Sequence, residues 1–177
     1  SDGQVVAFEV RRQDAGAAGG EGGNRQNLLD RGVNALNSLS GGSGPVEYRM
    51  RQGRGGLLEG YVSLKEFNAR SPKDVRQAVE ALDQQGADYL VLDLRDNLGG
   101  LVPAGVEVSR LFLGSEAPVV YTVASDGQLE DRVPHPAQYQ PPMTDKPLVL
   151  LVNGSTASAS EIVAGALKDN CRATLAG

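Results

Sequence analysis

Short apolar runs alternate with amphipathic helical patterns over residues 71–177, and this alternation constrains the fold more than any other feature. Residues 89–94 (YLVLDL) form a continuous apolar run, which is typical of a strand buried on both faces. Ahead of it, Ser71 is predicted to cap a helix whose first residue is Pro72 and which Gly86 ends. Because strands that alternate with helices form βαβ units, we expect an α/β fold with a largely parallel sheet.

The other elements are predicted from the same two periodicities. Helices are expected over residues 103–113 and 158–169, and strands over residues 46–51, 58–64, 119–124, 148–152 and 172–176. Residues 132–147 contain five of the nine prolines, which predicts an irregular excursion.

The first quarter of the chain has a different character. Residues 5–11 (VVAFEVR) predict a short strand. Residues 13–44 contain nine of the 23 glycines, and such a composition buries too little apolar surface to offset the entropy of ordering. We therefore expect a flexible linker or insertion there, with a short helical turn at residues 27–39.

Composition excludes several classes of function. The net charge is −5 and no basic residues cluster, so the chain lacks the electrostatic footprint of a nucleic-acid binder. The apolar runs are far shorter than the roughly 18 residues of a membrane span. The single cysteine, Cys171, excludes an internal disulfide framework and is predicted to be a small, partly buried residue. No pair of acids has metal-site spacing, and we expect no metal and no cofactor.

Two loops are candidates for chemistry, residues 95–100 (RDNLGG) and residues 153–158 (NGSTAS), because each follows a predicted buried strand. The carboxyl ends of parallel strands meet at one edge of a sheet, so these loops are expected to converge. Gly99 and Gly100 suit either an oxyanion hole or a simple tight turn.

The second loop runs into a helix start that carries four hydroxyls within residues 155–161 (STASASE). A serine nucleophile fits there, since helix N-termini stabilise developing negative charge. The pair Ser158 and Glu161 also reads as a plain capping box, and the residues alone leave both interpretations open. The single histidine, His135, lies between two prolines and is predicted to be an exposed loop residue rather than a triad base.

Three segments resemble the carboxyl-terminal processing peptidases, also called tail-specific proteases: residues 60–68 (GYVSLKEFN), 91–105 (VLDLRDNLGGLVPAG) and 151–177 (LVNGSTASASEIVAGALKDNCRATLAG). The resemblance is strongest to the plant and algal branch of the thylakoid lumen, which trims a photosystem II reaction-centre precursor. It implies an α/β core resembling crotonase over residues 45–177, preceded by the end of a PDZ domain at residues 1–12 and the Gly-rich stretch at residues 13–44.

The resemblance also implies roles for single residues. Ser158 matches the family nucleophile, and the N–H groups of Ala159 and Gly100 match its oxyanion hole. Asn97 and Gly99 match the glycine loop that supports the hole.

Asp169 matches a supporting acid of the family. The family base is a lysine that would follow position 177. Lys168 does not match it, so residues 1–177 alone are predicted to be inactive.

These assignments predict a serine endopeptidase of the Ser/Lys dyad type that cleaves near the C-terminus of protein substrates. The expected partners are substrate C-terminal segments, with peripheral membrane contact if the substrate is a membrane protein. The expected compartment is extracytoplasmic, a thylakoid lumen or alternatively a bacterial periplasm. Two alternatives are a non-catalytic ligand- or peptide-binding domain, as in retinoid-binding repeats of the same fold, and a crotonase-type acyl-thioester enzyme. Ser158 together with Gly99 and Gly100 favours the peptidase.

Overall fold

The structure, a computed structural model, describes residues 40–42, 44–123, 129–130 and 140–177. The predicted strand at residues 5–11, the helical turn at 27–39, nearly all of the Gly-rich stretch and His135 lie outside the described residues. The described elements are β1 (Ser40–Gly41), β2 (Val46–Gln52), a 3₁₀ turn η1 (Arg54–Gly56), β3 (Leu58–Leu64), α2 (Ser71–Gln84), β4 (Tyr89–Asp93), α3 (Val102–Leu113), β5 (Thr122–Val123), β6 (Leu129–Glu130), β7 (Leu148–Leu151), α4 (Ala159–Asp169) and β8 (Ala173–Ala176).

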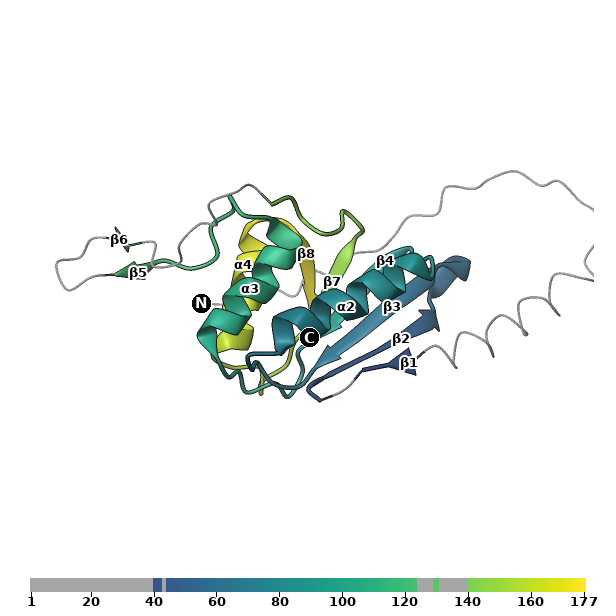
Figure 1. Cartoon of the computed structure of the whole chain (residues 1–177), viewed down its shortest axis with the longest axis horizontal. Coiled ribbons are helices and arrows are strands. Elements are labelled where there is room, and N and C mark those ends of the chain that lie inside the picture. The colour runs from purple at the N-terminus through teal and green to yellow at the C-terminus, as the bar shows by residue number, and fades with distance from the viewer. Residues whose placement is uncertain (1–39, 43, 124–128, 131–139) are drawn as a thin grey trace, which may run out of the picture.

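One six-stranded sheet organises the fold, in the order β1-β2-β3-β4-β7-β8 (Figure 1). Strands β3, β4, β7 and β8 are parallel, and β1 and β2 join them as antiparallel neighbours. The predicted α/β fold with a largely parallel sheet is confirmed. Among the described residues, the two short strands β5 and β6 form a separate antiparallel pair.

A single apolar core joins the sheet to α2, α3 and α4. Alternate residues of the parallel strands enter it, as Val62, Leu92 and Leu150 show, each at most 2% exposed. This two-residue period is that of a pleated strand, and the helices supply residues at their own three- and four-residue spacing, such as Val75 and Leu82 of α2. The core therefore fixes where each strand ends and where each following loop begins.

Helix α2 begins one residue earlier than the sequence predicts. Ser71 is the first helical residue and Arg70 occupies the cap position. The Ser71 hydroxyl does not cap the helix because it accepts from the Asn68 N–H at 2.9 Å and donates to the Glu66 carbonyl at 2.9 Å. The Ser71 side chain thus stabilises the preceding loop. At the other end, Gly86, with φ of +87°, follows the helix as expected.

One further prediction holds only in part, and another is wrong. Of the strand expected at residues 119–124, only Thr122 and Val123 are in a described strand. The chain just before them lies against α4 instead, where the Asn170 amide donates to the Pro118 carbonyl at 3.0 Å. Cys171 is exposed rather than partly buried, and it takes a left-handed φ of +54° in the turn that closes α4.

Candidate active site

A buried acid anchors the end of β4. The Asp93 carboxylate accepts from the Arg95 Nε at 2.9 Å, from the Arg95 Nη2 at 2.6 Å and from the Tyr61 hydroxyl. Burial alone would raise the pKa of Asp93, but the hydrogen bonds from Arg95 and Tyr61 outweigh it and lower that pKa to about 2. The guanidinium carbon of Arg51 lies 3.4 Å from the centroid of the Tyr61 ring, in a cation–π contact.

Sequence reasoning missed this network. The one available signal was an acid inside an otherwise apolar strand, followed two residues later by arginine. Its effect is local: it holds the residue from which the first loop departs.

The first loop is shaped by the fully buried side chain of Asn97. Its Nδ2 donates to the Leu64 carbonyl at 2.9 Å, and its Oδ1 accepts from the Gly99 N–H at 2.9 Å. Gly99 and Gly100 have φ of +101° and +136°, and a Cβ on Gly100 would overlap the Phe67 carbonyl oxygen. Both glycines are therefore required for the turn to form.

The second loop ends at Ser158, which takes φ of +55° and ψ of −121° ahead of α4. This backbone region is nearly closed to residues with a side chain and is typical of a nucleophile on a sharp strand-to-helix turn. The Ser158 N–H donates to Glu161 Oε2 at 2.7 Å, and the predicted capping box between Ser158 and Glu161 is present. The turn leaves Ser158 exposed at the helix start.

The two loops meet, as their positions after parallel strands predict. The Asn97 carbonyl accepts from the Ala157 N–H at 3.0 Å and from the Ser160 hydroxyl at 3.0 Å. A Cβ added to Gly99 would lie 2.7 Å from the Ser158 Cβ. Only a glycine in the first loop allows this approach to the second.

The four hydroxyls at the start of α4 are not equivalent. Thr156 Oγ1 donates to the Leu94 carbonyl at 2.9 Å, and Ser160 is fully buried and bonded to Asn97. Ser155 and Ser158 are both exposed, and of the two only Ser158 has the strained turn conformation. The structure thus narrows a choice that the sequence left open.

Two backbone N–H groups at the meeting point are not engaged. Within the described residues, neither Gly100 nor Ala159 donates its N–H to another protein group, whereas the Gly99 N–H is bonded to Asn97. Gly100 follows Gly99 in the first loop, and Ala159 follows Ser158 as the first residue of α4. One unused donor from each loop is the arrangement that an oxyanion hole needs.

The structure does not bring Asp169 to this place. It is the last residue of α4, eleven residues after Ser158, and lies exposed about 16 Å further along the helix at 1.5 Å rise per residue. Lys168 is its exposed neighbour. Among the described residues no group of His, Cys, Asp or Glu side chains could hold a metal ion.

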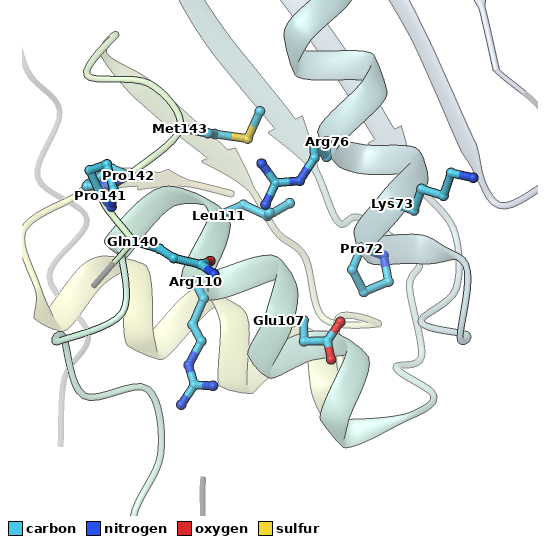
Figure 2. Close-up of a pocket in the computed structure, with 10 residues that line it drawn as sticks. All are labelled: Pro72, Lys73, Arg76, Glu107, Arg110, Leu111, Gln140, Pro141, Pro142 and Met143. Atoms are coloured by element: carbon cyan, nitrogen blue, oxygen red, sulfur yellow. The ribbon is translucent and has the colours of Figure 1, made fainter. Parts of the chain in front are cut away.

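A hollow of about 390 Å³ adjoins the first loop, lined by Lys65, Glu66, Asp96, Leu98, Gly99 and Gly100. A larger one of about 730 Å³ lies between the start of α2, the later turns of α3 and residues 140–143. Figure 2 shows Lys73 and Arg76 of α2 on one side of this larger hollow and Glu107 of α3 on the other. None of the site residues lines it, so its size does not make it the active site.

Residues 59–177 match the family described as peptidase family S41. The chain belongs to this family. Carboxyl-terminal-processing peptidase 1, chloroplastic, of Arabidopsis thaliana is 48% identical over 134 residues, which cover 75% of this chain and 27% of the relative. The carboxyl-terminal-processing protease of Synechocystis sp. is 47% identical over 133 residues, which cover 75% of this chain and 30% of that relative. The resemblance to carboxyl-terminal processing peptidases is confirmed.

A solved structure gives the same answer for this S41 chain. The photosystem II D1 C-terminal processing protease superimposes with a TM-score of 0.64 at 38% identity, over 75% of this chain and 36% of that one. The S41 chain therefore spans between a quarter and about a third of the length of these relatives. No helix among the described residues has the length and apolarity to cross a membrane.

Proposed function

We propose that this S41 chain carries the nucleophile and the oxyanion hole of a serine endopeptidase. The Ser158 hydroxyl attacks the carbonyl carbon of the scissile peptide bond, and the N–H groups of Ala159 and Gly100 stabilise the resulting oxyanion. The observation that carries the proposal is the strained Ser158 turn, set against Gly99 with an unused N–H on either loop. Asn97 and Gly99 position the Gly100 N–H.

The reaction needs a base that the site residues above do not include. The Ser158 proton passes to the base as the acyl–enzyme ester forms, and the base returns it to the departing amine; water then attacks the ester and regenerates the hydroxyl. We infer that the base is a lysine outside residues 1–177, which makes this a Ser/Lys dyad. Asp169 would support the site only indirectly, given its distance along α4.

The lysines of the chain fit this inference. Lys65, Lys73 and Lys168 are exposed, and burial is what favours the neutral amine that a base must be. Lys146 is occupied, since its Nζ lies 2.6 Å from Asp83 Oδ1 and also donates to the Ala87 carbonyl. From the family resemblance we also propose that residues 45–177 are the first part of a catalytic core resembling crotonase, and that residues 1–12 end a PDZ domain.

The substrate class follows from the relatives, whose names state carboxyl-terminal processing. We infer that the parent protein cleaves near the C-terminus of protein substrates in an extracytoplasmic compartment, with the thylakoid lumen favoured by the chloroplastic relatives. A D1-type photosystem II precursor is the first substrate to test, because the solved relative is named for that reaction. An extended substrate would be held through main-chain hydrogen bonds.

The test is labelling and turnover in the longer parent protein. A sulfonyl fluoride should label Ser158, and Ser158→Ala should abolish both labelling and cleavage of a peptide with a free C-terminus. Ser155→Ala is the matched control, an exposed serine in the same loop whose loss should change turnover less than about twofold. Wild-type cleavage by Ser158→Ala would overturn the proposal.

A further inference from the structure

A second link joins the two loops on the solvent side of the site. The Asp96 N–H donates to Asn153 Oδ1 at 3.1 Å, and Asn153 Nδ2 donates back to Asp96 Oδ1 at 2.9 Å. These residues are 57 positions apart in sequence, so nothing local brings them together. The pair is reciprocal: each residue donates once and accepts once across the gap.

The orientation of the Asn153 amide is fixed by its surroundings. Its Oδ1 also accepts from the Ser155 N–H at 3.1 Å, so the oxygen faces two backbone donors and the NH₂ faces the Asp96 carboxylate. The Asn153 N–H in turn donates to Thr156 Oγ1 at 3.0 Å, whose hydroxyl reaches back to the Leu94 carbonyl. Asn153 is thus hydrogen-bonded both within its own loop and to the first loop.

The link acts at a strained position. Asp96 has φ of +61°, a left-handed conformation that is uncommon for a residue with a side chain. It lies four residues before Gly100 in the same short loop, and Ser158 is the strained residue of the facing loop. Strain of this kind persists only where the surrounding contacts over-determine it. The Asp96–Asn153 pair supplies two of those contacts and ties the strained residue of one loop to the start of the other.

We propose that the Asp96–Asn153 pair is a positioning clamp that sets the spacing of the two oxyanion donors, Gly100 N–H and Ala159 N–H. The inference rests on the proposed function, since it assigns the clamp to that reaction. Neither clamp side chain touches the reacting atoms. Its effect reaches the site through the backbone of the two loops.

Three variants of the parent protein distinguish a clamp from a general surface contact. Asp96→Asn keeps an oxygen that accepts from Asn153, so kcat should stay within about twofold of wild type. Asn153→Asp keeps the oxygen that accepts the two backbone N–H groups but sets two carboxylates face to face, and the loops should part. The double exchange, Asp96→Asn with Asn153→Asp, restores a donor and an acceptor with the direction of the hydrogen bond reversed.

We therefore expect a small loss of kcat in Asp96→Asn, a large loss in Asn153→Asp and a recovery in the double exchange. Displacing a catalytic group by about 1 Å can lower the rate about 100-fold, so Asn153→Asp should lower kcat by between about 10- and 100-fold. Its KM should change less than about twofold, because the clamp positions donors that act on the oxyanion formed in the transition state. The double exchange should recover kcat to within about fivefold of wild type.

The assay is steady-state cleavage of one peptide by all variants, with thermal melting to show that each is folded. Wild-type kcat in folded Asn153→Asp, or no recovery in the double exchange, would overturn the clamp. If Asn153→Asp does not fold, Asp96→Ala replaces it, with an expected kcat loss of about fivefold at constant KM; wild-type kcat in that variant would equally overturn it. Ser158→Ala is run alongside: activity in that variant refutes the proposed function, whereas an inactive Ser158→Ala beside unaffected clamp variants refutes only the clamp.

Discussion

Replacing Gly99 with alanine should disable the site by forcing its two loops apart. The new Cβ would lie 2.7 Å from the Ser158 Cβ, 2.8 Å from the Ala157 carbonyl oxygen and 3.0 Å from the Ala159 nitrogen. Ordinary contact begins near 3.4 Å, so the two loops must separate by roughly 0.7 Å. A displacement of this order costs about 100-fold in rate, or about 2.7 kcal/mol of transition-state stabilisation.

The same substitution also strains the backbone. Gly99 has φ of +101°, where an alanine costs on the order of 1–3 kcal/mol. The assay is kcat/KM for a peptide substrate of the parent protein, with thermal melting of the same samples. A loss of about 100-fold is expected in protein that still melts cooperatively.

Gly154→Ala is the control for Gly99→Ala. It adds the same methyl group to the second loop, but there the Cβ would meet nothing within 4 Å. Its kcat/KM should stay within about twofold of wild type. A folded Gly99→Ala variant with kcat/KM within threefold of wild type would show that the close approach of the two loops is not needed for catalysis.

Two further predictions concern stability. Because hydrogen bonds from Arg95 and Tyr61 lower the pKa of Asp93 to about 2, below its ordinary 3.8, this carboxylate stabilises the folded state above about pH 4. That contribution, at most about 2 kcal/mol, should be lost as the pH falls from about 4 to about 2; urea denaturation across this range should show a steeper pH dependence for wild type than for Asp93→Asn, and equal slopes would contradict the assignment. Gly165→Ala should raise the free energy of unfolding by about 0.5–1 kcal/mol, since Gly165 is inside α4 and an added Cβ meets nothing within 4 Å; a lower melting temperature would show that α4 needs a glycine there.

The sequence predicted the strands and helices that position the site, because each of them follows from a pattern of neighbouring residues. The apolar run at residues 89–94 and the helical periodicity of residues 71–84 each identify an element without help from distant residues. Parallel pairing then places the loops after β4 and β7 at one edge, so the convergence of residues 95–100 and 153–158 follows from topology. Two of the three segments that carry the family resemblance, residues 91–105 and 151–177, contain these loops.

Predictions failed where a residue makes a contact other than the one that its local pattern favours. Ser71 looks like a cap, but its hydroxyl is bonded to the loop before it. Residues 119–121 look like a strand, yet they lie along α4 and pair with no described strand. In each case the local preference is weak, and a contact that no local pattern encodes outweighs it.

The choice among the hydroxyls at the start of α4 illustrates the division between sequence and tertiary structure. The sequence alone determined that a helix starts there, after a buried strand, with a glycine loop on the same edge. Only the tertiary structure decided that Thr156 and Ser160 donate to the carbonyls of Leu94, just after β4, and Asn97 of the first loop, while Ser158 is strained and exposed beside Gly99. The reason is that a hydroxyl's role depends on which backbone groups lie within about 3 Å of it, and here those groups come from residues about 60 positions away.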